Sequence, residues 1–126
     1  MNNDILFFFG AHMDVLPIYE KLEEQILAQI PDVKIKVAKT QITFANKRDF
    51  AFASFNPCRN AARRPKVWIT VTFGLGYQKE SPRIDVATEP HPNRWTHHVM
   101  VGSVDEIDEE LMNWIQEAAE FSAGKR

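Results

Sequence analysis

The sequence predicts an α+β fold: a two-layer sandwich in which an antiparallel sheet of four to six strands carries N- and C-terminal helices packed on one face. Two observations lead to this prediction. Apolar residues recur at helical spacing near both ends of the chain, whereas between the ends they alternate with polar residues as in strands. Because each helix must bury its apolar stripe, both are expected on the same sheet face. The length of 126 residues fits a single domain over residues 1–126.

The first part of the chain carries helix signals. Residues 4–10 predict a short helical turn whose phenylalanines dock on the core. A longer helix should begin after Asp14 as its N-cap, tolerate Pro17 in its first turn and run to about Ile30. Pro31 then ends it. Its apolar stripe at helical spacing consists of Ile18, Tyr19, Leu22, Ile26 and Ile30.

A change in apolar phase marks the next segment. Apolar residues occupy odd positions in 33–37 but even positions in 42–44. A bulge, a bend or a turn must therefore lie at residues 38–41. Because such irregularities are frequent near functional sites, Lys39 and Gln41 become candidate site residues.

The middle of the chain predicts strands joined by turns. Residues 46–49 have the composition of a hairpin turn, and 56–66, rich in arginine, predict a surface loop. Residues 67–75 form the clearest alternating pattern. A long connection over 77–94, with a short strand at 83–87, follows.

The last strand and helix come next. Residues 95–101 predict a strand in which Trp95 and His97 share one face while His98 lies on the other, so the adjacent histidines cannot serve one site. Residues 103–106 predict a capping box that starts the last helix. Its apolar stripe consists of Ile107, Leu111, Trp114, Ile115, Ala118 and Phe121.

The sheet face away from the helices is predicted to be open or shared with a partner. It is too polar for a buried core, yet it carries a tryptophan and a methionine. An alternative function is therefore protein interaction or homodimerisation through this face, with a second copy or a host protein as partner. The residues expected there are Trp68, Thr70, Thr72, His98 and Met100.

Charge is unevenly distributed although the net charge is only −2. Residues 34–66 hold nine basic residues against one acid, and the remainder of the chain has a net charge of −10. A basic segment of this kind attracts anions locally. The alternative explanation is that both helices simply present solvated acidic faces.

Composition indicates a cytoplasmic protein. The single cysteine, Cys58, permits no internal disulfide and suits a reducing compartment. The apolar run at residues 6–9 is too short for a signal segment or a membrane span. We expect no membrane contact.

Several sequence blocks resemble a widespread prokaryotic family that is known only as a domain of unknown function. The resemblance covers nearly the whole chain and implies a small cytoplasmic domain with no established activity and no agreed catalytic residues. The most specific blocks are Lys-Thr-Gln-x-x-Phe at 39–44 and Glu-Pro-x-Pro-x-Arg-Trp-Thr-His-His at 89–98.

An anion pocket is the leading site hypothesis. The ligand would carry a phosphate or carboxylate, for which arginine supplies a planar fork, lysine a point charge and tryptophan a stacking surface. Alternatively, Arg83 and Arg94 only brace the loop by pairing with Asp85 and Glu89. The predicted ligand-binding residues are Lys39, Thr40, Gln41, Arg83, Arg94, Trp95 and His97.

Nucleic-acid binding is a variant of this hypothesis. Its phosphate contacts would come from the basic segment, and Trp68 or Phe44 would stack on bases. No recognised nucleic-acid motif accompanies these residues. The basic residues concerned are Lys47, Arg48, Arg59, Arg63, Arg64 and Lys66.

Metal binding and catalysis are weaker alternatives. Glu89, His91 and His97 offer a three-ligand metal set, although their spacing matches no strong motif. A catalytic arrangement would use His97 as general base, Lys39 as stabiliser, and either Ser81 or Cys58 as nucleophile. We expect an anion-binding or interaction domain rather than an enzyme, with no cofactor.

Overall fold

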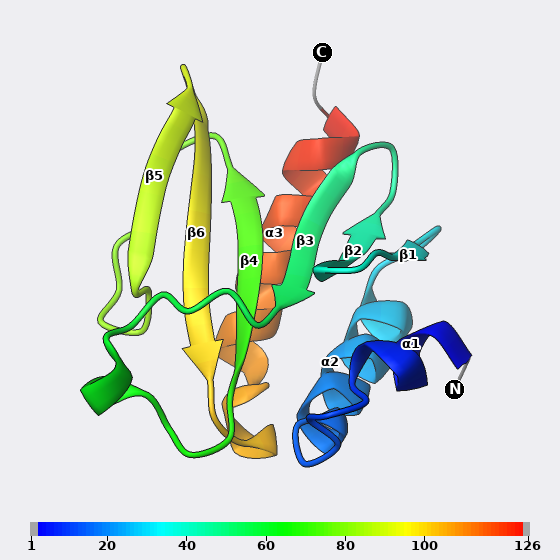
Figure 1. The fold of residues 1–126 in the computed structure, drawn as a ribbon. Helices are drawn as coiled ribbons and strands as arrows, with labels where there is room; N and C mark the ends of the chain where they lie inside the picture. The colour runs from blue at the N-terminus through cyan, green and yellow to red at the C-terminus, as the bar shows by residue number, and fades with distance from the viewer. Residues whose placement is uncertain (1–2, 125–126) are drawn as a thin grey trace.

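The structure is a computed structural model that describes residues 3–124. Six strands form one antiparallel sheet in the order β1-β2-β3-β4-β6-β5 (Figure 1). The helices are α1 (Asn3–Phe8), α2 (Leu16–Gln29) and α3 (Glu109–Gly124). The strands are β1 (Lys34–Val37), β2 (Gln41–Ala45), β3 (Asp49–Ser54), β4 (Ile69–Leu75), β5 (Val86–His91) and β6 (Arg94–Val101).

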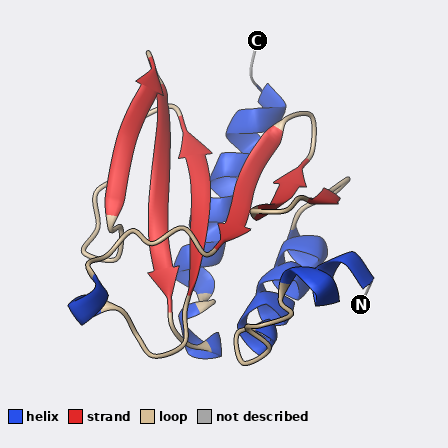
Figure 2. Cartoon of the chain, viewed as in Figure 1, coloured by secondary structure: helices blue, strands red, loops and turns tan. Residues whose placement is uncertain are grey.

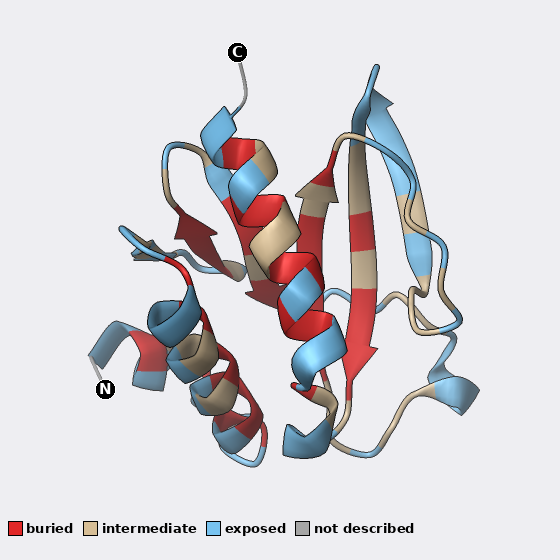
Figure 3. Cartoon of the chain, turned by 180° about the vertical axis from the view of Figure 1, so that it is seen from behind, coloured by how far each residue is buried: buried red, intermediate tan, exposed pale blue. Residues whose placement is uncertain are grey.

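Two helices cover one face of the sheet. Seen from behind, α3 crosses the sheet and α2 lies beside it, and both turn their buried residues inward (Figure 3). We call this side of the sheet the helix face and the other side the open face. The predicted α+β sandwich is confirmed. Within residues 3–124, no helix has both the length and the apolar character needed to cross a bilayer.

The side chains of β4 point alternately to the two faces of the sheet. Ile69, Val71 and Phe73 are fully buried on the helix face, where the helices remove apolar surface from water. Thr70 and Thr72 point to the open face between them. The apolar stripes predicted for the two long helices are buried except for Phe121, which is half-buried.

The starts of the helices differ from the prediction. Val15, not Asp14, precedes α2, and no side chain caps it. The residues 103–106 do not open α3 but form a separate 3-10 turn over Val104–Glu106. Asp108 caps α3 instead, because its Oδ1 accepts from the Leu111 amide at 3.0 Å.

The phase change at residues 38–41 is a turn. Strand β1 ends at Val37 and β2 begins at Gln41, with the Ala38 amide donating to the Gln41 carbonyl at 2.9 Å. Lys39 and Thr40 are therefore the exposed corner of a tight hairpin. The predicted turn over residues 46–49 is also present between β2 and β3.

The strand in the long connection lies further along than predicted. Strand β5 covers Val86–His91 rather than 83–87, and it forms the outer edge of the sheet beside β6. Pro90 is tolerated there because an edge strand leaves some amides unpaired. The β5–β6 turn contains Asn93 with φ of 61°, a conformation that asparagine accepts more readily than most residues.

The open face is only partly open. Residues 55–68, which we call the strap, run from β3 across the face and return to β4 (Figure 2). Thr70 and Met100, predicted to be accessible, are 0% and 2% exposed. The surface loop expected at 56–66 is thus a loop that closes one end of the open face.

Candidate functional site

A groove of about 720 Å³ lies on the part of the open face that the strap leaves uncovered. Its walls come from the β1–β2 turn, from the centre of the sheet and from the first residues of the strap. Its aromatic lining residues are Phe8, Phe52 and Phe55, and its polar ones are Lys39, Thr40, Gln41, Ser54, Asn56, Thr72, Thr96 and His98.

The floor of the groove is set by strand register. Thr43, Phe52, Thr72 and His98 pair successively across β2, β3, β4 and β6. Because cross-strand partners point to the same face, these side chains form one row on the open face. Phe52 stands in its centre and is half-buried.

His98 and Thr72 form the polar part of this row. The Nδ1 of His98 lies 2.8 Å from the Thr72 hydroxyl, and either atom can be the donor, depending on the tautomer. Burial lowers the pKa of His98 below its ordinary value of 6.5. The ring is therefore neutral at pH 7, and its Nε2 has no hydrogen-bond partner within residues 3–124.

The described lining of the groove carries one cation and no anion. Among the described residues that line it, none is an aspartate or a glutamate, whereas Lys39 stands at its rim. The other polar side chains are hydroxyls, amides and one imidazole, all of which can donate a hydrogen bond. This set suits an anion better than a cation.

An aromatic cluster closes one end of the groove. Phe55 stacks on Phe8 with ring centroids 5.7 Å apart, and His12 lies 4.5 Å from the same ring. Trp68 meets Phe55 edge-on and carries the Arg64 guanidinium on its ring at 5.9 Å. The cluster ties α1 to the strap and gives the groove a fixed wall.

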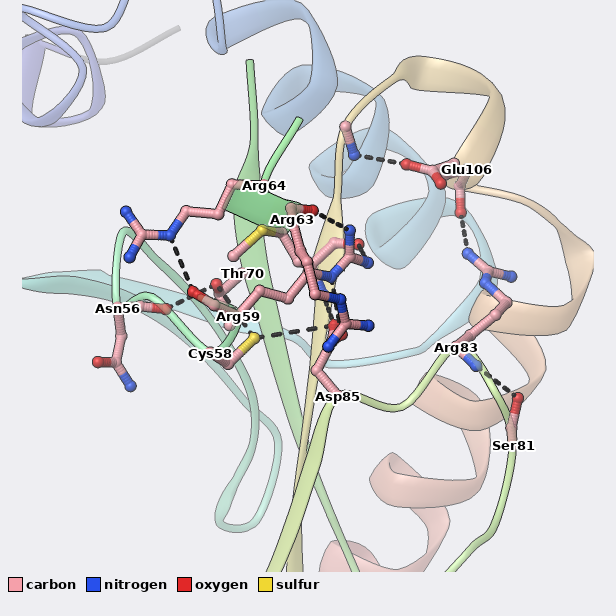
Figure 4. A network of polar contacts seen from close by, with 12 residues as sticks. Asn56, Cys58, Arg59, Arg63, Arg64, Thr70, Ser81, Arg83, Asp85 and Glu106 are labelled. Carbon is pink, nitrogen blue, oxygen red and sulfur yellow. Dashed lines mark hydrogen bonds and ion pairs between the residues drawn. The ribbon is translucent and has the colours of Figure 1, made fainter. Parts of the chain in front are cut away.

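A buried ion pair holds the strap in place (Figure 4). The Asp85 side chain, 8% exposed, accepts from Arg59 Nε at 2.7 Å and from the Met100 amide at 2.9 Å. Arg59 also donates to the Met100 carbonyl at 3.3 Å. The Thr70 hydroxyl donates to the Asn56 carbonyl at 2.8 Å, which positions one of the two strap residues that line the groove.

The predicted anion-pocket residues do not converge on one cavity. Lys39, Thr40 and Gln41 line the groove together. Arg94 and Trp95 line a smaller adjoining cavity of about 180 Å³ near the β5–β6 turn. The two cavities share Phe52 and Thr96 as lining residues, but Trp95 lies on the same face of β6 as His97, and the smaller cavity extends to Phe73 and Phe121 on the helix side.

Arg83 lies outside the groove. Its guanidinium donates to Asp108 at 2.9 Å and to Glu110 at 3.0 Å, and it lies 5.7 Å from the centre of the Trp114 ring. Arg83 thus braces the structure through ion pairs, as the alternative expected. Its partners are Asp108 and Glu110 at the start of α3 rather than Asp85. Sequence spacing did not reveal this pairing because the partners lie 25 and 27 positions away.

His97 also lies outside the groove, on the helix face. Its ring is fully buried, stacks on Phe73 at 4.9 Å and accepts from the Lys79 amide through Nε2 at 2.9 Å. The predicted separation of His97 from His98 is confirmed by the register of β6. His97 therefore cannot meet a ligand held near Lys39.

The residues named for the metal site and for catalysis make their contacts elsewhere in the structure. Residues 3–124 contain no group of three or more histidine, cysteine, aspartate or glutamate side chains placed to hold a metal ion. Glu89 accepts from the Asn93 amide at 3.0 Å and belongs to the hairpin turn instead. Ser81 Oγ accepts from the Arg83 amide, and the Cys58 thiol lies 3.9 Å from the Thr70 hydroxyl and 3.8 Å from Asp85, so the polar contacts of both nucleophile candidates are with residues other than His97.

The two residues expected to stack on bases in the nucleic-acid alternative are engaged within the protein. Phe44 is fully buried in the core, and Trp68 is covered by Arg64 and Phe55. Arg59 is paired with Asp85, and Arg64 Nε donates to the Arg59 carbonyl. Two of the arginines expected to contact phosphates therefore hold the strap.

Several groove residues were not predicted as ligand-binding. Alternation had placed Thr72 and His98 on the open face, but nothing in the sequence linked them to Lys39. Phe52, Ser54 and Thr96 enter the groove only through the pairing of β3 with β4 and of β4 with β6. Such pairing depends on contacts between distant segments.

The comparisons with known proteins identify the family. No curated protein and no solved structure matches this chain. The profile of one family, described as "Domain of unknown function (DUF5655)", matches residues 7–122. This match spans nearly all of the chain and agrees with the expected membership of a family known only as a domain of unknown function, and the chain therefore belongs to the DUF5655 family.

Proposed function

We propose that this domain binds a small anionic ligand in the open-face groove, with Lys39 as the principal charge. The observation that carries the proposal is the composition of the groove lining: one lysine, one histidine, four hydroxyl side chains and two amides, with no carboxylate among the described lining residues. Its volume of about 720 Å³ is that of a small-molecule site.

The lining offers a physical route to recognition. Lys39 is exposed at the rim of the groove and attracts a phosphate or carboxylate as a point charge. Deeper in, the Thr72–His98 pair leaves His98 Nε2 free to bond the ligand. Hydrogen bonds to a charged group are stronger than neutral ones, at about 1.5 to 3 kcal/mol each.

The remaining predicted residues divide into two groups. Arg94 lines the adjoining cavity and would meet a ligand that extends past Phe52, whereas Trp95 lies on the helix side of β6 together with His97. Arg83 and His97 are engaged elsewhere and are left out of the proposed site. The alternative of a flat interaction face is less favoured, because the strap covers one end of the sheet and leaves a groove.

The test is a titration with pyrophosphate followed by amide chemical shifts in two-dimensional NMR. We expect shifts at residues 39–41, 54–56 and 96–98. Lys39→Ala should weaken binding about tenfold, the effect of losing one charge-assisted hydrogen bond. Lys47→Ala is the matched control, because Lys47 is also an exposed turn lysine but does not line the groove.

Two results would contradict the proposal. One is the absence of groove shifts at millimolar pyrophosphate. The other is an equal loss of affinity in both lysine variants, which would indicate general attraction to a basic surface rather than a site.

A further inference from the structure

Phe52 gives the floor of the groove a bare aromatic ring. The side chain is half-buried and contacts no other aromatic ring within residues 3–124, unlike Phe8 and Phe55, which stack on each other. Its cross-strand neighbours on both sides are threonines, Thr43 on β2 and Thr72 on β4. A phenylalanine ring in the middle of a threonine-flanked row offers its surface to a flat ligand.

An aromatic ring on the centre of a sheet is a natural stacking platform. Aromatic side chains on sheets stack with nucleobases, and each such contact is worth up to about 3 kcal/mol. An aliphatic anion would gain nothing from this surface beyond apolar contact. The floor of the groove therefore discriminates between flat aromatic ligands and aliphatic ones.

Resting on the anion site proposed above, we infer that the ligand is a nucleoside monophosphate, with its base stacked on Phe52 and its phosphate at Lys39. The groove supplies groups for the base and the phosphate of such a molecule: a ring for the face of the base, two side-chain amides for its edge and a cation for the phosphate.

Lys39 and Phe52 lie within reach of one nucleotide. Lys39 stands in the β1–β2 turn, four positions before Thr43, the cross-strand neighbour of Phe52, so at about 3.5 Å per residue the Cα positions of Lys39 and Thr43 are at most about 14 Å apart. Lys39 and Phe52 both line the groove, and a phosphate joined to its base through one ribose can contact both.

Polar side chains around the ring can read the edge of a base. Asn56 lines the groove, and its side-chain amide points away from the strap network (Figure 4). Gln41 lies on the opposite wall, its amide nitrogen 3.5 Å from the Thr43 hydroxyl. Each amide offers both a donor and an acceptor, as base edges require.

A free nucleotide is favoured over a nucleic-acid strand. A strand needs cations that follow its backbone. Arg59 and Arg64 of the strap are engaged by Asp85 and Trp68, which leaves Lys39 as the one basic side chain among the described groove-lining residues. One phosphate matches one such charge.

The experiment compares AMP with ribose 5-phosphate, which has the same phosphate and sugar without the base. Affinities are measured by calorimetry on the full chain. We expect AMP to bind at least tenfold more tightly than ribose 5-phosphate. Phe52→Leu should remove that advantage while leaving ribose 5-phosphate affinity unchanged. Phe7→Leu is the matched control, because Phe7 is 89% exposed and does not line the groove.

A second measurement does not depend on any variant. In the AMP complex, the adenine protons should shift upfield from the ring current of Phe52 and show nuclear Overhauser contacts to its ring protons. If Phe52→Leu proves poorly folded by thermal melting, these contacts in the unaltered chain decide the matter.

The outcomes separate the two proposals. Equal affinity for AMP and ribose 5-phosphate, with groove shifts for both, overturns the nucleotide but keeps the anion site. Absence of groove shifts with both compounds and with pyrophosphate overturns both proposals. If benzoate binds as tightly as AMP, the site is assigned to aromatic carboxylates. If a single-stranded hexanucleotide binds a hundredfold more tightly than AMP, the site is assigned to nucleic acid. Either result overturns the free nucleotide.

Discussion

His97 and His98 are neighbours in the chain, but the pleat of β6 gives them separate surroundings. His97 lies under α3 with the charges of Lys79 and Glu117 nearby, and His98 faces the groove. Burial lowers the pKa of both rings below the ordinary value of 6.5. Folding therefore favours the neutral form at each position.

Stability should fall on acidification as a result. Below about pH 6.5 the unfolded chain binds protons that the folded chain does not, so the free energy of unfolding decreases as pH falls. The slope is at most about 1.4 kcal/mol per pH unit for each histidine. Urea unfolding at pH 7.5, 6.0 and 5.0 measures it.

His97→Gln should flatten this pH dependence. Glutamine does not titrate but can still accept a hydrogen bond of the kind that the Lys79 amide donates. The control is His91→Gln, the same substitution at an exposed position in the β5–β6 hairpin. An unchanged slope in His97→Gln would show that His97 protonation is not coupled to folding.

At the scale of elements, the start of α3 shows how two capping signals compete. Ser103 and Asp108 each precede an acidic run, yet only Asp108 bonds a helix amide. Ile107, between them, is 2% exposed. Ile107 directly follows the 3-10 turn over Val104–Glu106 and packs into the core. In the same turn, the Glu106 carboxylate accepts a hydrogen bond from the Gly102 amide.

Asp108→Ala should destabilise the protein by about 1 to 2 kcal/mol, the usual cost of losing an N-cap. Ser103→Ala should change stability by less than about 0.5 kcal/mol, since its side chain makes no capping bond. Thermal and urea unfolding of both variants provide the measurement. A larger loss in Ser103→Ala than in Asp108→Ala would contradict the observed cap.

The strap depends on its buried ion pair. Asp85→Ala leaves Arg59 without its carboxylate and the Met100 amide without its acceptor, and should cost about 3 kcal/mol. Hydrogen exchange should accelerate in residues 56–68 before it does so in β4. Asp49→Ala is the control: its pair with Lys36 is exposed, 45% and 63%, and should contribute less than about 1 kcal/mol.

Slow exchange of the strap in Asp85→Ala would show that other contacts hold it. The aromatic contacts of Phe55 with Phe8 and Trp68 are the candidates, because they join the strap to α1 and its first residue to its last. A combined Asp85→Ala and Phe55→Ala variant would then locate the anchor.

At the scale of the molecule, charge is separated between the two layers. Lys34 and Lys36 of β1 share the face of Thr43, and the strap that crosses this face is rich in arginine, whereas the acids of α2 and α3 belong to the helix layer. The groove thus lies on the basic side of a protein whose net charge is −2. Such a distribution attracts anions locally.

The affinity of the groove for pyrophosphate should therefore depend moderately on salt. A fall of a few-fold is expected as ionic strength rises from about 0.05 to 0.2 M, because the screening length shortens from about 14 to about 7 Å. Calorimetry at several salt concentrations measures this slope, and Lys39→Ala should make it shallower. A fall of several hundredfold would indicate a polyanion instead.

Local patterns predicted the elements and their faces well. The periodicity of α2, the alternation of β4 and the opposite orientation of His97 and His98 follow from backbone geometry, which needs no distant partner. The boundaries of β5 and the cap of α3 were wrong. They depend on which neighbouring segment supplies hydrogen bonds and burial.

The sequence by itself determined the α+β class, the order of elements and the interruption of the strand pattern at residues 38–41, because helical and strand periods are properties of short segments. Only the tertiary structure decided that Lys39 shares a groove with Phe52, Thr72 and His98, while Arg83 and His97 serve the helix layer. Strand register and the path of the strap set those distances. Both arise from contacts between residues far apart in the chain, which no local pattern records.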